Sequence, residues 1–501
     1  MLIDLDNYKI SNSTIKKINK EMAYKHCVFP FEEDENKIKV VMENTENFDV
    51  INDLSFVSKK EIEPFKGNKM QILEYIKLYY EISDGNNAVE DMKKELVAVK
   101  EDISLNESKQ LSNAPSVRLV DSILLQALNQ KASDIHIEPF KSFIKIRIRK
   151  DGLLKELMKL PINAYNTIVI RIKIMAKMNI IIKKLPQDGK ISYEKDGENY
   201  DFRVSSIPTI YGEKIVIRIL YKSLSNISID KLGGKEAEIF REILKYPYGI
   251  ILVTGPTGSG KSTTMYSMLN ELNNKEKNIF TIEDPVEFTI GNVNQINVNN
   301  KVGLTFASGL RSLLRQDPDI IFVGEIRDEE TAKVAIRAAI TGHLVISTLH
   351  TNDAVSSILR LVDMGVKPYL VSQALVAAIA QRLVRVICPY CKVSYKPSEI
   401  ERKILNIDSE YYIYKGMSCP KCNGTGYLGR TAVFEIMKVD EIVKKFIYEG
   451  KGLEEIRKHA AVKNMKTLKM STLDLVKKGI TTFDEYVKTV YSSEEVCDEL
   501  L

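Results

Sequence analysis

The hydrophobic pattern changes its period several times along the chain. In residues 37–42 and 143–149 apolar and polar side chains alternate, which predicts strands with one buried face, whereas residues 70–80 repeat apolar positions at helical spacing. Between about residues 235 and 380, short apolar runs alternate with helical stretches. Runs of this kind predict a parallel sheet that helices cover on both faces, so the fold class is α/β.

These changes predict several consecutive regions rather than one core, because 501 residues exceed the usual domain size of about 100–200. The regions are an N-terminal α/β module (1–82), a polar linker (83–115), a second, smaller α/β domain (116–222), a hinge (223–234), a parallel-sheet core (235–381), a module with paired cysteines (382–437) and a C-terminal helical region (438–501).

Composition and charge exclude several classes of protein. Hydrophobic residues make up 44% and charged residues 28%, the usage of folded globular chains rather than disordered ones. The net charge of +5 is too small to indicate nucleic-acid binding by the whole chain. Asp4 and Asp6 stand where a signal peptide is basic, and no run of 18 apolar residues occurs. We therefore expect a cytoplasmic protein that neither enters the secretory route nor spans a membrane.

A phosphate-binding loop is predicted at residues 255–262. The segment reads GPTGSGKS, which fits the pattern G-x-x-x-x-G-K-[ST], and it follows an apolar strand and precedes a helix. Glycines let the backbone turn several N–H groups toward one polyphosphate at a helix N-terminus. Lys261 is expected to neutralise the β and γ phosphates, and Ser262 to give an oxygen to Mg²⁺. The predicted ATP-binding residues are Gly255, Pro256, Thr257, Gly258, Ser259, Gly260, Lys261, Ser262 and Thr263.

Three further polar residues follow buried strands. Glu325 comes just after residues 320–323, at the carboxyl end where open α/β sheets bind ligands. There it can orient or deprotonate an attacking water, or bind Mg²⁺ through water. Glu283 begins an acidic cluster after residues 279–282, which suggests metal handling; a plain surface charge is the alternative. His350 ends the run 344–349; from the residues themselves, a structural histidine is the favoured interpretation and a γ-phosphate contact the alternative.

Four long segments together resemble the nucleotide-site boxes of the secretion ATPase superfamily, which includes the type IV pilus assembly and type II secretion ATPases. The segments are GPTGSGKST (255–263), TIEDPVE (281–287), DPDIIFVGEIRD (317–328) and AAITGHLVISTLHTNDA (338–354). The resemblance implies a RecA-like ATPase core. It also implies nucleotide roles for Lys261, Ser262, Glu283, Glu325 and His350, and thereby favours the functional interpretation of His350.

The second α/β domain also resembles its counterpart in that family. ASDIHIEP (132–139), LPQDGK (185–190) and GEKIVIR (212–218) are similar to segments of a PAS-like domain that the family docks over its ATP site. The resemblance implies that Arg203 and Arg218 act as arginine fingers, a task suited to a guanidinium because it stays charged. A plain surface arginine is the alternative for each.

Two C-x-x-C pairs predict a structural zinc site. Cys388 with Cys391, and Cys419 with Cys422, supply the four thiolates of a tetrahedral site. Their separation is longer than the commonest ribbon spacing of about 15–20 residues, and a redox dithiol is the alternative. The pairs, followed by GYLGR at 426–430, resemble the cysteine module of pilus-assembly and type II secretion ATPases.

The resemblance implies a cytoplasmic ATPase that forms a hexameric ring at the inner face of the cell membrane. ATP, Mg²⁺ and Zn²⁺ are the expected cofactors, and an inner-membrane platform protein and cytoplasmic pilus-assembly proteins are the expected partners. The expected function is assembly of a type IV pilus or similar filament; the alternatives are a type II secretion motor and a zinc-containing nucleic-acid translocase. Residues 10–81 resemble part of the family's coupling domain but lack its long Leu and Gly motifs, so no cyclic di-GMP binding is expected.

Overall fold

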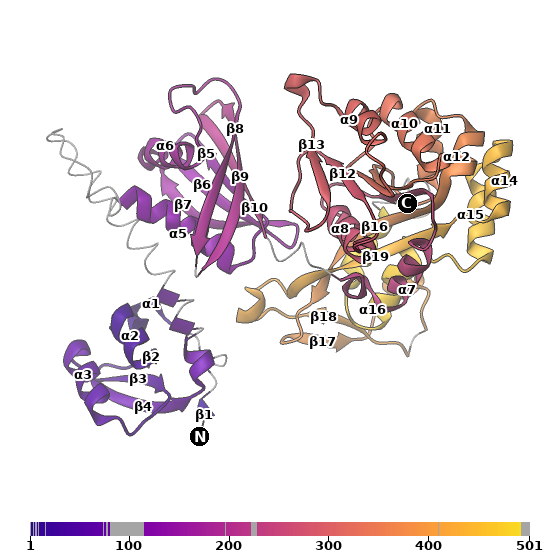
Figure 1. Cartoon of the computed structure of the whole chain (residues 1–501). Helices are drawn as coiled ribbons and strands as arrows, with labels where there is room; N and C mark the ends of the chain where they lie inside the picture. The colour runs from indigo at the N-terminus through magenta and orange to yellow at the C-terminus, as the bar shows by residue number, and fades with distance from the viewer. Residues whose placement is uncertain are drawn as a thin grey trace. The chain divides into compact units, whose positions relative to one another are not determined.

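The computed structural model divides into two compact units, residues 1–221 and residues 222–501 (Figure 1). It describes residues 2–491 with the exception of residues 4, 6, 7, 9, 16, 74, 77, 78, 81–114, 196, 222–227 and 409. Nearly all of the predicted linker, and the first part of the predicted hinge, lie outside the described residues.

The N-terminal module is a small sheet with helices, as its mixed pattern predicted. The strands follow the order β1-β4-β3-β2, and β3 covers the stretch whose alternation predicted a strand. The elements are β1 (Leu2–Ile3), α1 (Asn12–Ile15), α2 (Lys20–His26), β2 (Val28–Glu33), β3 (Lys37–Met42), α3 (Phe48–Ser58) and β4 (Glu61–Gly67).

The second domain is a six-stranded antiparallel sheet with the order β7-β6-β5-β10-β9-β8. Alternation along its strands buries one face: in β6 every second residue is buried, and these residues join side chains of α5 and α6 in one core. The elements are α5 (Pro115–Asn129), β5 (Asp134–Pro139), β6 (Phe143–Lys150), β7 (Leu153–Pro161), α6 (Tyr165–Met175), β8 (Gln187–Lys195), β9 (Glu198–Thr209) and β10 (Gly212–Leu220).

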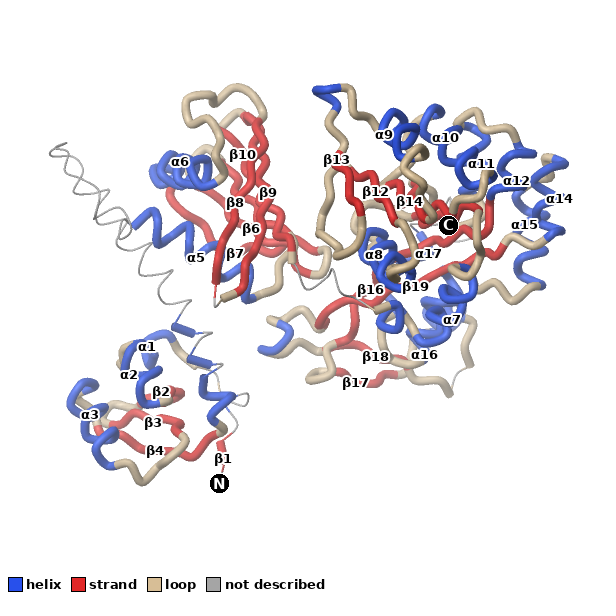
Figure 2. Tube along the Cα trace, in the orientation of Figure 1, coloured by secondary structure: helices blue, strands red, loops and turns tan. Residues whose placement is uncertain are grey.

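The second unit is built on a seven-stranded sheet with the order β13-β12-β14-β15-β11-β16-β19 (red strands in Figure 2). It is parallel except for β19, which runs antiparallel to β16. The strands are β11 (Gly249–Thr254), β12 (Ile279–Glu283), β13 (Asn294–Asn297), β14 (Ile320–Val323), β15 (Leu344–Leu349), β16 (Leu375–Ile387) and β19 (Tyr427–Lys438).

Helices cover both faces of this sheet. Ile250 and Leu252 of β11 belong to a core cluster on one side, and Ile251 and Val253 to a cluster on the other. Burial on both faces is why these strands read as continuous apolar runs. The helices are α7 (Gly234–Ile243), α8 (Lys261–Leu272), α9 (Phe306–Leu313), α10 (Glu329–Ile340), α11 (Ser356–Asp363) and α12 (Pro368–Ala374).

The described end of the predicted hinge packs into the second unit. Residues 229–232 form a short 3-10 turn, and Ile229 is fully buried in the same core cluster as Phe240 of α7. A connection that carries a buried anchor of this kind is fixed at its carboxyl end.

The boundary expected at residues 381/382 falls inside β16. This strand continues to Ile387 and pairs with β19, so the cysteine module is an excursion between two strands of the main sheet. The excursion contains β17 (Lys392–Tyr395), α13 (Glu399–Leu405) and β18 (Ile413–Gly416).

The C-terminal region is helical, as predicted. Its helices are α14 (Glu441–Glu449), α15 (Leu453–Val462), α16 (Leu468–Lys477) and α17 (Phe483–Tyr491). Among the described residues, none of the helices combines the length and apolar character that crossing a membrane requires.

Candidate nucleotide site and cysteine cluster

The phosphate loop connects β11 to α8, at the carboxyl edge of the sheet. Gly258 and Gly260 have φ values of 81° and 89°, which side chains rarely tolerate. At Gly255 a Cβ would lie 2.5 Å from the carbonyl oxygen of Gln381, so this position also requires glycine. The glycines at these positions therefore allow the tight turn in which backbone N–H groups can line a phosphate site.

Lys261 is the first residue of α8 and folds back over the loop. Its Nζ donates hydrogen bonds to the carbonyl oxygens of Gly255 at 2.7 Å and Pro256 at 3.1 Å. Burial lowers the pKa of Lys261 to about 8, and the nearby charge of Glu325 opposes this shift. The ammonium group is thus held at the loop by carbonyl oxygens.

The donor set of the loop fits a polyphosphate with its cation. A Cβ placed on Gly258 would meet no atom within 4 Å, so the loop's outer side is open. The hydroxyls of Ser259 and Thr264 are buried without a hydrogen-bond partner in the described part of the chain. Hydroxyl donors, backbone N–H groups and an ammonium are the groups that bind phosphate oxygens, and Ser262 in the first turn of α8 offers a Mg²⁺ ligand.

Glu325 and His350 lie close together in the structure. Glu325 follows β14 and is only 15% exposed, and its Oε2 lies 3.5 Å from Nε2 of His350, which follows β15. Oε1 accepts a 2.5 Å contact from the guanidinium of Arg327. The structure therefore brings two of the predicted site residues together and adds Arg327, which no feature of the sequence pattern had singled out.

Glu283 is held inside the domain rather than exposed at its edge. Its carboxylate accepts hydrogen bonds from the Tyr266 hydroxyl at 2.5 Å and the Thr281 hydroxyl at 2.6 Å, and the residue is 4% exposed. Burial, reinforced by the charge of Glu283, raises the pKa of Tyr266, so the phenol stays protonated and donates. Because Tyr266 lies on α8, this network joins Glu283 to the helix of the phosphate loop.

Two threonines connect the phosphate loop to the loop that carries His350. The hydroxyls of Thr254, at the end of β11, and Thr351 lie 2.6 Å apart, and the Thr351 backbone N–H donates to the Thr254 hydroxyl at 2.7 Å. These contacts fix the distance between the two loops. The position of His350 is thereby fixed relative to β11, the strand that leads into the phosphate loop.

Arg203 and Arg218 lie on neighbouring strands of the second domain. They are register partners in β9 and β10, and Nε of Arg218 donates to Asp134 at 2.9 Å. Arg218 is 60% exposed, which leaves its guanidinium accessible. Both arginines belong to the first compact unit and the phosphate loop to the second, so their role at the nucleotide remains a proposal.

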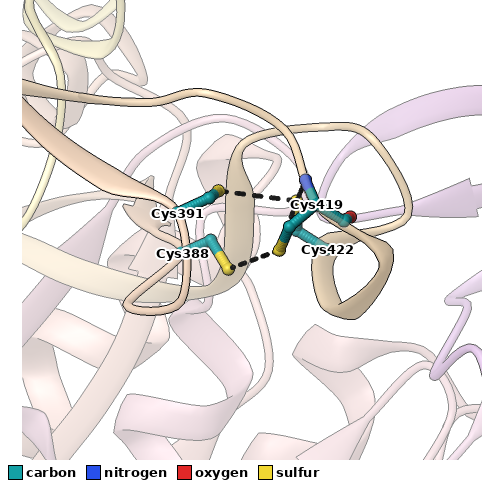
Figure 3. A group of neighbouring side chains, drawn as sticks. All are labelled: Cys388, Cys391, Cys419 and Cys422. Carbon is teal, nitrogen blue, oxygen red and sulfur yellow. Dashed lines mark hydrogen bonds between the residues drawn. The ribbon is translucent and has the colours of Figure 1, made fainter. Parts of the chain in front are cut away.

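The four predicted metal ligands form one cluster, which Figure 3 shows. The sulfur of Cys388 lies 3.7 Å from that of Cys419, and the sulfur of Cys391 lies 3.9 Å from that of Cys422. Four sulfurs at about 2.3 Å from a tetrahedral zinc ion are about 3.8 Å apart, so the cluster fits Zn²⁺. Four thiolates would fill every position of a tetrahedral zinc ion, as in structural rather than catalytic sites.

Backbone N–H groups favour a thiolate at one of the four cysteines, Cys422. Burial opposes ionisation of Cys422, but the backbone N–H groups of Cys419 and Gly426 donate to its sulfur and lower its pKa to about 6. A Cβ on Gly416 would lie 2.0 Å from the Gly426 carbonyl oxygen, so two glycines allow the strands to approach there. The cluster thus ties the ends of β16 and β18 to the start of β19.

A glycine-rich loop between a buried parallel strand and a helix, with a carboxylate at the end of a nearby strand, defines a P-loop ATPase. Comparison with known proteins agrees and narrows the class. Residues 109–488 match the family described as type II/IV secretion system protein, and residues 1–86 match the MshEN domain. The chain belongs to the type II/IV secretion system ATPase family.

Its similarity to individual members extends over most of the chain. The type IV pilus assembly ATPase PilB of Myxococcus xanthus is 41% identical over 97% of this chain and 88% of its own length. The type II secretion system ATPase E of Vibrio cholerae is 44% identical over 76% of each chain. The crystal structure of the pilus retraction motor PilT with bound ADP has a TM-score of 0.51 and 28% identity, and covers 74% of this chain and 96% of that one.

Proposed function

We propose that the chain is a cytoplasmic motor at the inner face of the cell membrane that drives assembly of a type IV pilus through an inner-membrane platform protein. The observation that carries the proposal is the extent of similarity. The match to the pilus assembly ATPase reaches 97% of the chain, whereas matches to type II secretion ATPases cover 76% and 85% of it. The N-terminal module, which would couple the motor to its partners, contributes to this difference.

The geometry supports ATP hydrolysis by the following assignments. Lys261 and the backbone of the phosphate loop bind and orient the β and γ phosphates, and Ser262 is the proposed Mg²⁺ ligand; the ion, when bound, screens phosphate charge. Glu325 accepts the proton of the attacking water, since its carboxylate is held at the strand end between Arg327 and His350. His350 orients that carboxylate and contacts the γ-phosphate. Arg203 and Arg218 stabilise charge on the transferring group when the second domain closes over the site.

The motor is proposed to act as a homohexamer, because a site completed by arginines of another domain suits a ring that opens and closes in turn. Sedimentation of the full chain with a non-hydrolysable ATP analogue tests this, with a six-subunit species as the expected result. A species that stays monomeric at every concentration would contradict it.

The function is tested by deleting the gene and complementing it with the wild type, Lys261→Ala or Lys275→Ala. We expect surface filaments to disappear on deletion and to return with the wild type and with the exposed-lysine control Lys275→Ala, but not with Lys261→Ala. Filaments that persist in the deletion strain while secretion of a folded exoprotein fails would favour the type II secretion motor instead.

The N-terminal module raises the separate question of cyclic di-GMP binding. It matches the MshEN domain. Its sequence lacks the long Leu and Gly motifs through which some relatives bind cyclic di-GMP, and for that reason no binding is expected. The expected absence of binding therefore stays a prediction, which titration of the full chain with fluorescent cyclic di-GMP tests.

A further inference from the structure

Two buried polar residues of β16 lie beside the phosphate loop, and the assignments above do not use them. Thr254 of β11 is the register partner of Ala380, so Gln381 and Arg382 continue β16 alongside Gly255. A Cβ on Gly255 would lie 3.1 Å from Nη1 of Arg382. The guanidinium of Arg382 therefore lies next to the first glycine of the loop.

This guanidinium is buried and has no carboxylate partner among the described residues. Arg382 is 6% exposed; it donates from Nη1 to the Gln381 carbonyl at 3.1 Å and from Nη2 to the Asn352 carbonyl at 2.9 Å. Its Nε is buried without a partner in the described part of the chain. A buried cation of this kind is costly unless an anion approaches it.

The nearest carboxylates are already engaged elsewhere. Asp353 accepts from the guanidinium of Arg457 at 2.9 Å, and Glu435 accepts from the backbone N–H groups of Ala354 at 2.9 Å and Leu468 at 3.2 Å. Their charges favour the charged form of Arg382, but neither carboxylate forms an ion pair with it in the described part of the chain. An anion from outside this set of side chains can therefore pair directly with Arg382.

The phosphate loop is where such an anion binds. Lys261 donates to the Gly255 carbonyl, so two cations share the surroundings of one glycine, and the charge of Arg382 disfavours the charged form of Lys261. Ser259 Oγ and Gln381 Oε1 are buried there without partners in the residues described. A polyphosphate in the loop offsets both positive charges at once.

We propose that Arg382 is a positioning residue of the nucleotide site, which holds the phosphate loop and the loop of His350 in register once a nucleoside triphosphate is bound. One end of its guanidinium lies at Gly255 and the other bonds the Asn352 carbonyl, two residues after His350. Asp353 follows and pairs with Arg457 of α15, so the connection reaches the C-terminal helices. This inference rests on the proposed ATP-binding function.

The test compares Arg382→Gln with Arg385→Gln in the full chain. Arg385 lies on the same strand and is also largely buried, but it pairs with Glu485 at 2.8 Å and faces the Tyr427 ring. For Arg382→Gln we expect fluorescent ATP to bind about tenfold more weakly, kcat to fall as well as KM to rise, and the ATP-induced rise in Tm to shrink by half or more. Arg385→Gln is expected to lower the Tm without nucleotide but to keep the ATP-induced rise.

The readouts separate positioning from stability. If Arg382→Gln lowered the Tm equally with and without ATP, and bound fluorescent ATP within about twofold of wild type, the inference would be overturned. If the glutamine variant does not fold, Arg382→Lys takes its place, because lysine keeps the charge but cannot bridge both loops. A reduced ATP-induced rise in Tm is then expected. A rise in Tm equal to that of the wild type would contradict the proposal. A wild-type chain that did not bind ATP would instead refute the proposed function.

Discussion

At the scale of single residues, the proposed nucleotide site depends on a few side chains that are held both by near neighbours in sequence and by residues of other elements. Glu325 lies between Arg327 and His350, and Glu283 accepts hydrogen bonds from Tyr266 and Thr281. The glutamates therefore differ in their surroundings: Glu283 is enclosed, while Glu325 keeps an accessible edge. In the proposed mechanism, Glu325 is therefore the glutamate that takes a proton from water.

Glu325→Gln tests that role. Glutamine keeps the size of the side chain and can bond to Arg327, but it cannot accept the proton of the attacking water. We expect kcat for ATP hydrolysis to fall by about 10²–10⁴-fold while the Kd for fluorescent ATP changes little. Steady-state hydrolysis and equilibrium binding measure the two quantities. A variant that hydrolysed ATP at the wild-type rate would show that another group is the base.

The pKa of Lys261, lowered to about 8 by burial, predicts a pH dependence of binding. Below this pKa the ammonium is charged and attracts phosphate; above it the neutral amine does not, and bound phosphate raises the pKa again. Affinity for ATP should therefore be nearly constant from about pH 6.5 to 7.5 and fall above pH 8 by up to about tenfold per unit. Lys261→Met should bind weakly and without this slope. An equal slope in both proteins would assign the titration to another group.

At the scale of elements, the residues of the candidate site lie in loops at the carboxyl edge of the sheet. The phosphate loop follows β11, Glu325 follows β14 and His350 follows β15, and the Thr254–Thr351 contact fixes two of these loops to each other. β16 continues past this edge to Ile387, and Cys388 of the cysteine cluster follows directly. A single strand thus joins the nucleotide site and the cysteine module.

The cysteine module should hold one zinc ion per chain, measured by atomic absorption of the purified protein. Cys419→Ser and Cys422→Ser should lose most of it, because each removes one of four thiolates. The Tm should fall, since the ion ties the loop between β16 and β19. Cys27→Ser is the matched control, because Cys27 lies in the other compact unit and should leave the zinc content unchanged. Full zinc content in both cluster variants would refute a four-cysteine site.

At the scale of the whole molecule, the two compact units divide the proposed catalytic groups between them. The phosphate loop, Glu325 and His350 belong to one unit, and Arg203 and Arg218 to the other. In the proposed function, ATP binding needs the first set of residues and hydrolysis needs both sets.

Arg203→Gln and Arg218→Gln should therefore separate binding from hydrolysis. We expect kcat to fall by about 10²-fold or more, with the Kd for fluorescent ATP within about threefold of wild type. Lys159→Gln, on the edge strand β7 of the same sheet and 55% exposed, should change neither quantity. Full activity in both arginine variants would leave them as ordinary surface residues and remove the support for closure.

Much of this protein could be predicted from local pattern. The alternation in residues 37–42 and 143–149 predicted β3 and β6, because a strand buried on one face has an apolar residue at every second position. The wholly apolar runs predicted β11, β14 and β15, because a strand buried on both faces is apolar throughout. The four cysteines were recognisable because metal ligands come with characteristic spacing. The long boxes also indicated the family, which the comparisons confirmed.

Contacts between distant segments were beyond such patterns. Nothing local to Arg382 shows that β16 runs beside β11, so its position at Gly255 appears only when the strands are paired. The same holds for β19, which closes the sheet after a long excursion, and for Tyr266, which meets Glu283 across two elements. Periodicity records how each segment is buried, but the partner of a buried polar group depends on which strands become neighbours, and that is a property of the assembled sheet.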